Sequence, residues 1–174
     1  MLRAKLLLLL ALNVISWGAE AQYPKQAGCS QQNFDQKVNE YLSYTVPVID
    51  VDRANKDKDQ FVFIDTREKD EFQTSHIQDA LWLGYDQPQW QNIKHVSKNQ
   101  KIVVYCSIGY RSEKMGEKLK KMGYVNVYNL YGSIFEWTNR NYPVFSEGKK
   151  TNYIHTYNKS WSKWVTGPKL IKVW

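Results

Sequence analysis

The residue of this chain best suited to covalent chemistry is Cys106, which lies in a short loop between an apolar run and a helical pattern. The apolar run, residues 101–105, has the composition of a strand that is buried on both faces of a parallel sheet. Open parallel sheets bind ligands at the carboxyl ends of their strands, so Cys106 is predicted to lie at a ligand-binding edge.

The loop after Cys106 is suited to binding an anion. Its single glycine lets the backbone curl with N–H groups pointing inward, and the helix that follows adds the positive end of its dipole. Such a field favours the nucleophilic thiolate, and Arg111 adds a fixed positive charge with a planar pair of donors. We therefore expect Cys106 and Arg111 to be catalytic. The residues expected to form the anion-binding loop are Ser107, Ile108, Gly109, Tyr110 and Ser112.

Other roles for Cys106 are compatible with its residue type. A cysteine can be a small buried core residue, or it can pair with Cys29 in a disulfide if the protein is exported. A metal site is disfavoured, because none of the three histidines, His76, His95 and His155, has metal-ligand spacing to either cysteine. We predict no metal and no cofactor.

Five segments have the pattern of buried strands. The clearest are residues 61–64 and 101–105, which are continuous apolar or β-branched runs that end at a polar or reactive residue. Residues 125–130, 46–49 and 80–83 are less regular candidates. Strands that alternate with helices predict an α/β layer fold with right-handed crossovers.

Two segments have helical periodicity. Residues 30–44 carry apolar side chains at helical spacing. In residues 112–122, Ser112 is placed to cap the first turn and Gly123 to end the helix. The apolar positions are Phe34, Val38, Tyr41 and Leu42 in the first segment, and Met115, Leu119 and Met122 in the second.

Taken in order, these motifs resemble the rhodanese-like domain family over residues 45–140. The resemblance rests on residues 61–67, Glu71-Phe72, His76-Ile77, Ala80, residues 106–112, Gly123-Tyr124, Val127, residues 130–132 and Trp137. It implies a three-layer α/β fold with a five-stranded parallel sheet flanked by helices. It also implies that Cys106 accepts a sulfane sulfur, forms a persulfide stabilised by the loop amides, and passes the sulfur to a thiophilic acceptor.

The chain departs from the family pattern at a few positions. Ser75, Asp79 and Ser133 stand at turn positions where the family commonly has glycine. Ser107 replaces a basic residue that often follows the cysteine in members that use thiosulfate, so the loop mouth has one positive charge fewer. Cysteine phosphatases of related fold have five residues between cysteine and arginine, whereas four separate Cys106 from Arg111, which favours sulfur transfer over phosphate hydrolysis.

Asp65 and Arg67 follow the first core strand and are predicted to support the site. An ion pair that fixes the end of the strand explains this spacing better than direct catalysis does. His76 is likewise predicted to be a hydrogen-bonded structural residue, because transfer through an ionised thiol needs little proton chemistry.

The first 21 residues have the pattern of a signal peptide. Arg3 and Lys5 form a basic segment, residues 6–14 are apolar, and residues 19–21 form a small-x-small cleavage site. The apolar run is too short to span a bilayer. We expect export to a periplasm or to the exterior. Acylation of Cys29 as a lipoprotein is the less favoured alternative, because Gln26 stands where an aliphatic residue is required.

The formal net charge of +7 is concentrated in the C-terminal part of the chain. Residues 22–139 hold 15 basic and 15 acidic residues, whereas residues 140–174 hold seven basic residues and one acidic residue. Because the body is neutral, no nucleic-acid partner is predicted. The tail, residues 141–174, is rich in aromatic residues and lysines, a pattern that suits extra core, an acidic protein partner or a membrane surface.

Four segments are therefore predicted: a signal peptide (1–21), an N-terminal helical arm (22–44), a rhodanese-like domain (45–140) and a basic aromatic extension (141–174). The main functional hypothesis is an exported sulfurtransferase with a small sulfur donor and a thiophilic acceptor as its partners. A non-catalytic binding or sulfur-carrier module and a redox-responsive thiol protein are the alternatives.

Overall fold

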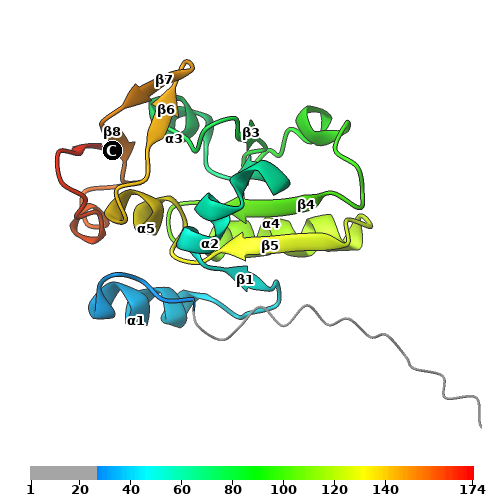
Figure 1. Ribbon diagram of the computed structural model, residues 1–174, viewed down its shortest axis with the longest axis horizontal. Coiled ribbons are helices and arrows are strands. Elements are labelled where there is room, and N and C mark those ends of the chain that lie inside the picture. The colour runs from blue at the N-terminus through cyan, green and yellow to red at the C-terminus, as the bar shows by residue number, and fades with distance from the viewer. Residues whose placement is uncertain (1–26) are drawn as a thin grey trace, which may run out of the picture.

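A parallel sheet forms the centre of the protein in the computed structural model, which describes residues 27–174 (Figure 1). The predicted signal peptide and residues 22–26 lie outside the described residues. Five parallel strands form the sheet in the spatial order β1-β5-β4-β2-β3, which confirms the fold class predicted from the sequence. The strands are β1 (Val48–Ile49), β2 (Val62–Asp65), β3 (Leu81–Trp82), β4 (Lys101–Tyr105) and β5 (Asn126–Leu130).

The two faces of the sheet carry separate apolar cores. Phe63 and Val103 point into one core, whereas their neighbours in sequence, Ile64 and Val104, point into the other. This alternation follows from the two-residue period of a strand, and apolar residues at successive positions show that both faces are covered. β4 is the central strand, so the loop that follows it lies at the middle of one edge of the sheet.

Helices cover both faces and complete three layers (Figure 1). The first core includes side chains from α1 (Gln32–Tyr41), α2 (Val51–Lys56) and α5 (Ser133–Asn139), and Phe72 of α3 (Lys69–Thr74) packs against it. The second includes side chains from α4 (Tyr110–Lys121) and from the short 3-10 helix η2 (Trp90–Ile93). Another 3-10 turn, η1 (Lys58–Gln60), precedes β2.

The helix predicted over residues 112–122 begins two residues earlier than expected. Gly109 is the residue that precedes α4, so Ser112 lies inside the helix and the prediction that it is the cap is wrong. Of the three apolar positions named for this segment, Met115 and Leu119 are buried, whereas Met122, which follows the last residue of α4, is exposed.

The N-terminal arm is tied to the domain. The backbone N–H of Cys29 donates to the Asp35 carboxylate (2.8 Å). The backbone N–H and the hydroxyl of Ser30 both donate to the Glu136 carboxylate in α5 (2.7 and 3.1 Å). Both cysteines are free thiols, so the alternative of a Cys29–Cys106 disulfide is absent from this structure.

The C-terminal extension folds onto the same side of the molecule as α1 and α5. It forms a hairpin of β6 (Val144–Ser146) and β7 (Lys149–Thr151), a parallel pair of β8 (Tyr153–His155) and β9 (Ile171–Val173), and the 3-10 turn η3 (Ser162–Trp164). Ile154 and Val165 are fully buried in the first core, and the Trp164 ring stacks on Phe34 with 5.7 Å between centroids. Part of the extension therefore belongs to the core, which was one of the three roles considered for it from the sequence.

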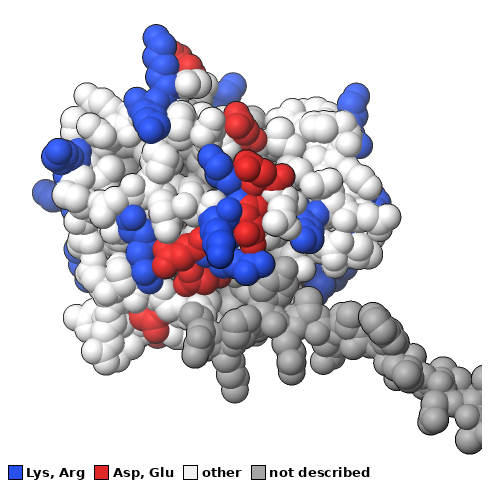
Figure 2. Space-filling model, viewed as in Figure 1, with Lys and Arg blue, Asp and Glu red and all other residues white. Residues whose placement is uncertain are grey.

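Charged side chains are mixed in sign over the face seen in Figure 2, where blue and red residues alternate across the centre. Basic side chains are also prominent over the β6–β7 hairpin at the top of that view. Across residues 27–174, no helix has the length and apolar character needed to cross a membrane.

Candidate active site

Cys106 directly follows β4 and lies at the base of a pocket. Its side chain is buried, with 1% of its surface exposed. Its backbone N–H donates to the hydroxyl of Ser133 (3.2 Å), and its Sγ accepts the backbone N–H of Gly109 (3.1 Å). The sulfur thus lies beside the loop, with an N–H donor of the loop backbone directed at it.

The loop is held in its curled form by contacts to the neighbouring strand. Gly109 has a backbone φ of +127°, a conformation that glycine adopts most readily. Its carbonyl accepts the side-chain amide of Asn129 in β5 (3.0 Å) and the hydroxyl of Ser112 (3.0 Å). The Ser112 oxygen also lies 2.7 Å from Oδ1 of Asn129. Loop, helix and strand are thereby fixed to one another at the point where the sulfur must be placed.

The surroundings of Cys106 favour its thiolate. Burial alone raises the pKa of this thiol, but the charge of Arg111 and hydrogen bonds from Ser112 and Gly109 have the opposite effect and outweigh it. The pKa of Cys106 is therefore below its ordinary value. A depressed pKa is the property that a nucleophilic cysteine requires at neutral pH.

Arg111 is held by Glu71 of α3. Its Nη1 donates to Oε2 of Glu71 (2.7 Å), and its Nη2 donates to Oε1 (2.8 Å) and to the hydroxyl of Ser107 (3.0 Å). The pair of donors that was predicted to bind a substrate anion is therefore already occupied by a carboxylate. The charge of Arg111 lowers the pKa of the Cys106 sulfur, and its role in binding a substrate anion stays a prediction.

Glu71 is the site residue that sequence reasoning did not identify. Burial raises the pKa of its carboxyl, but Arg111 and then Arg67 outweigh this effect and hold the pKa below its ordinary value. Glu71 also accepts the backbone N–H of Glu68 (3.0 Å), which closes the first turn of α3. Glu71 lies beside the cysteine loop because it pairs with Arg111, which comes 40 residues after it in the sequence. No local sequence pattern indicates such a tertiary contact.

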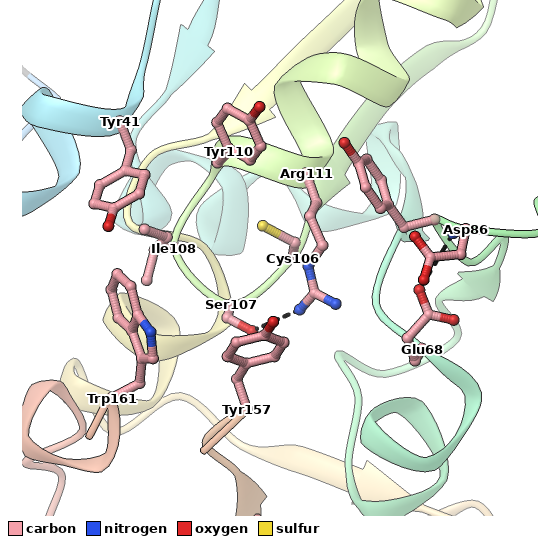
Figure 3. Close-up of a pocket in the computed structure, with 11 residues that line it drawn as sticks. Tyr41, Glu68, Asp86, Cys106, Ser107, Ile108, Tyr110, Arg111, Tyr157 and Trp161 are labelled. Atoms are coloured by element: carbon pink, nitrogen blue, oxygen red, sulfur yellow. Dashed lines mark hydrogen bonds between the residues drawn. The ribbon is translucent and has the colours of Figure 1, made fainter. Parts of the chain in front are cut away.

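A pocket of about 430 Å³ opens above Cys106 (Figure 3). Aromatic side chains dominate its walls, and they come from the N-terminal helix, the domain and the C-terminal extension. Two carboxylates, those of Glu68 and Asp86, also line it. The lining residues are Tyr41, Glu68, Tyr85, Asp86, Cys106, Ser107, Ile108, Tyr110, Arg111, Tyr157 and Trp161.

Asp65 and Arg67 form the ion pair that was predicted at the end of β2. Both side chains are fully buried, and Arg67 donates through Nε and Nη2 to the Asp65 carboxylate (3.0 and 2.7 Å). Nη2 also donates to the carbonyl of Ser75, which follows α3. The charge of Arg67 helps to lower the pKa of Glu71, and neither Asp65 nor Arg67 lines the pocket.

His76 lies away from the sulfur. Its Nδ1 is 2.9 Å from the carbonyl of Phe72, and its ring stacks on the Phe72 ring. Its backbone pairs with Phe145 of β6. These contacts agree with the structural role predicted for this histidine. Among residues 27–174, no group of His, Cys, Asp and Glu side chains is arranged as a metal site.

Comparison with known proteins identifies a family. A model of the rhodanese-like domain family matches residues 50–140. The chain is also similar to two curated proteins named tRNA uridine(34) hydroxylase. The one from Erwinia tasmaniensis is 33% identical over 105 residues, which cover 55% of this chain and 30% of the relative. The one from Aster yellows witches'-broom phytoplasma is 38% identical over 91 residues, which cover 49% and 29%. The chain thus spans about a third of the length of these relatives.

Solved structures give the same fold. A rhodanese-related protein from Thermoplasma volcanium is 23% identical, with a TM-score of 0.50 over 58% of this chain and 99% of that one. Thiosulfate sulfurtransferase from Pseudomonas aeruginosa is 19% identical, with a TM-score of 0.53 over 60% of this chain and 21% of that one. At these identities, the likeness shows the arrangement of strands and helices alone.

Proposed function

The chain belongs to the rhodanese-like domain family, and from that premise we propose that it is a sulfurtransferase that carries sulfane sulfur as a persulfide on Cys106. The observation that carries the proposal is the position of one atom. Sγ of Cys106 lies at the base of an open pocket, accepts the N–H of Gly109 and has a depressed pKa. A merely structural cysteine needs none of these three features.

The proposed reaction has two displacement steps. In the first, the Cys106 thiolate attacks the outer sulfur of a donor, and the bond from that sulfur to the donor breaks with its electron pair leaving on the donor. The new S–S bond makes Cys106 a persulfide anion. In the second, a thiophilic acceptor attacks the outer sulfur, and the Cys106 thiolate leaves. Because the thiolate is restored, the cycle needs no cofactor and no net redox partner.

The surroundings of Cys106 suit both steps. The charge of Arg111 and the N–H of Gly109 stabilise negative charge on the cysteine, whether it is attacking or leaving. Glu71 keeps the guanidinium oriented, and Ser107 joins the two through its hydroxyl. The pocket supplies room above the sulfur for a donor molecule.

We also propose that the protein is exported to a periplasm or to the exterior. The proposal rests on the signal-peptide pattern of residues 1–21. Packing of Cys29 near Glu136 and Arg140 favours cleavage near Ala21 over lipidation of Cys29. Mass determination of the amino terminus in protein isolated from each cell fraction tests this: a mature chain that begins at Gln22 supports it, and an uncleaved chain or an acylated Cys29 contradicts it.

The net charge of the domain does not favour activity on tRNA, which the relatives' name states for them. Residues 22–139 hold 15 basic and 15 acidic residues, so they carry no net positive charge to attract a polyanion.

The proposed function is tested by trapping the persulfide. The full chain is incubated separately with thiosulfate, with mercaptopyruvate and with an organic thiosulfonate. The mass of the peptide that contains Cys106 is then measured by mass spectrometry. A mass gain of one sulfur atom on Cys106, lost again when cyanide or a thiol is added, is expected. Cys106→Ser is the matched control, since it retains the size of the side chain and cannot carry the sulfur.

The alternatives give different results. A peptide that gains no sulfur from any donor would place the protein among binding modules without catalysis. A persulfide present on isolation that no acceptor removes would indicate a sulfur carrier. A cysteine that changes only between thiol and oxidised forms would indicate a redox-responsive protein.

A further inference from the structure

We propose that the C-terminal extension selects the sulfur donor. Tyr157 and Trp161 of the extension and Tyr41 of α1 all line the Cys106 pocket, and we call these three rings the aromatic wall. The wall suits a donor that bears an aromatic ring and a single negative charge, such as an arenethiosulfonate, over the small dianion thiosulfate. This inference rests on the proposed function, because it names the substrate class of the same site.

The aromatic wall comes from outside the part of the chain that matches the family. The family model covers residues 50–140, whereas the three wall residues lie before or after that range. The rings are in contact: Tyr41 and Trp161 meet edge to face with 5.6 Å between centroids, and Tyr41 and Tyr110 meet with 6.4 Å. Figure 3 shows Tyr41 and Trp161 side by side, with Ile108 between them and the cysteine.

The extension is anchored so that the wall has a fixed position. Thr156 is fully buried, and both its N–H and its hydroxyl donate to the carbonyl of Val173 (2.8 and 3.3 Å). Ile154 and Val165, on either side of the wall residues in sequence, are buried in the first core. Trp161 also packs against that core. The wall is thus part of the folded body of the protein.

Tyr157, which lines the pocket, has an uncommon backbone conformation. Its backbone φ is +65°, a region that non-glycine residues adopt only at some energetic cost and that is common at functional positions. Its N–H donates to Nδ1 of His155 (3.1 Å). The guanidinium carbon of Arg111 lies 5.3 Å from the centroid of the Tyr157 ring. Tyr157 is nevertheless 55% exposed. An exposed ring beside a catalytic cation is available to contact a bound substrate.

The charges around the pocket disfavour a dianion. Arg111 is the cation in its lining, and its charge is balanced by Glu71. Glu68 and Asp86 add two carboxylates to the same pocket, and Asp86 donates its N–H to Glu68 (3.3 Å). With Cys106 as a thiolate, the pocket has a net negative charge. Repulsion scales with the charge of the incoming donor, so a monoanion is repelled less than thiosulfate is.

An arenethiosulfonate has the aromatic ring and the single negative charge that the pocket favours, and it can also donate a sulfane sulfur. The Cys106 thiolate attacks its terminal sulfur, and the S–S bond to the sulfonyl sulfur breaks. The electron pair of that bond leaves on the arenesulfinate anion. The products are the Cys106 persulfide anion and the sulfinate, so two negative charges enter and two remain, and no oxidant or reductant is consumed.

The inference is tested by substrate ratios in the full chain. We measure kcat/KM for benzenethiosulfonate, methanethiosulfonate and thiosulfate, the first two of which differ only in the ring. Stacking and burial of the ring are expected to give the aryl donor about a tenfold advantage over the methyl donor. Trp161→Ala and Tyr157→Ala are expected to reduce that ratio to within about threefold. Trp174→Ala, an exposed aromatic residue of the same extension away from the pocket, is the matched control and should retain it.

A binding measurement separates this inference from the proposed function. Calorimetry compares benzenesulfinate and methanesulfinate on Cys106→Ser, which performs no transfer. Tighter binding of the aryl anion, lost in Cys106→Ser with Tyr157→Ala, supports the aromatic wall even if no donor forms a persulfide. Equal binding of the two anions, or equal kcat/KM for aryl and methyl donors while the persulfide forms, overturns the inference and leaves the sulfurtransferase intact. Tyr157→Ala removes an exposed side chain and is expected to fold, so the binding measurement can still be made if Trp161→Ala does not fold.

Discussion

Arg111 and Glu71 face each other in a two-point ion pair, with 2.7 Å between Nη1 and Oε2 and 2.8 Å between Nη2 and Oε1. The cation of the active site is therefore already paired before any substrate enters. Its remaining influence is on the nearby sulfur, whose pKa it lowers. Under the proposed function, this arrangement separates activation of the nucleophile, which needs a positive charge, from recognition of the donor, which we assign to the pocket walls.

The first prediction concerns the ionisation of the two cysteines. Cys106 should be alkylated by iodoacetamide with a midpoint below the ~8.5 of an ordinary thiol, because its pKa is lowered. Burial and the carboxylates of Glu136 and Asp35 raise the pKa of Cys29, so this thiol should react only at a much higher pH. Peptide mass spectrometry over a pH series measures both.

Cys29 thus serves as the internal control, because its surroundings raise the pKa of its thiol, whereas those of Cys106 lower it. Identical pH profiles for the two cysteines would contradict the depressed pKa of Cys106. Alkylation of both only after reduction would show that they are bridged in solution.

The second prediction concerns Glu71→Gln. Removing the carboxylate charge leaves Arg111 unneutralised, so the alkylation midpoint of Cys106 should fall further and thiosulfate should become a relatively better donor. Loss of the ion pair should lower the free energy of unfolding by about 1–3 kcal/mol. The control is Glu40→Gln, which removes an exposed carboxylate of α1 that pairs with Lys37. An unchanged midpoint in Glu71→Gln would show that the pair has no electrostatic effect on the sulfur.

The third prediction concerns the buried ion pair of Asp65 and Arg67. Asp65→Asn leaves the Arg67 guanidinium fully buried without its counter-charge, so the free energy of unfolding should fall by about 3–5 kcal/mol. Urea unfolding measures the effect, with the exposed Asp59→Asn as the control. The double variant Asp65→Asn with Arg67→Met should recover part of the loss, because the unpaired charge is gone. A loss of less than 1 kcal/mol in Asp65→Asn would contradict this assignment.

The fourth prediction uses Ser133, which stands where the family commonly has glycine. Its backbone φ is +52°, and its hydroxyl accepts the N–H of Cys106 (3.2 Å). Ser133→Ala leaves this buried N–H without a partner and should destabilise the fold by about 1–3 kcal/mol. Ser133→Gly loses the same hydrogen bond but relieves the left-handed backbone, so its loss should be about 1 kcal/mol smaller. Thermal unfolding of the two variants ranks them, and the reverse order would refute the argument.

The sheet and the position of Cys106 were predictable because they depend on local signals. Residues 102–105 form a continuous apolar run, and such a run has few alternatives to a strand buried on both faces. The spacing of Asp65 and Arg67 likewise predicts a contact between neighbours in sequence, and that contact is present. Both signals lie within a few residues of the feature that they predict.

The differences from expectation arise where tertiary contacts decide. α4 begins at Tyr110 because the backbone of Gly109, which Asn129 holds from β5, turns into the helix before Ser112 is reached. Glu71 pairs with Arg111, which lies 40 residues away in sequence, and Ser30 of the N-terminal arm bonds Glu136, which lies 106 residues away. Residue type and periodicity carry no information on such distances, so these contacts become visible only in the folded structure.

The tether between Ser30 and Glu136 has a consequence for the order of events during synthesis. A ribosome makes the amino-terminal part first, and about 5–20 residues follow each second, so α1 waits several seconds for α5. A ten-residue helix has little stability by itself, and closing so long a loop is slow. α1 is thus expected to dock late, after Phe135 and Trp164, which its Phe34 contacts, have been made. A nascent chain halted soon after residue 140 would already contain the cysteine loop, but it would lack Trp161, the ring that Tyr41 contacts in the pocket.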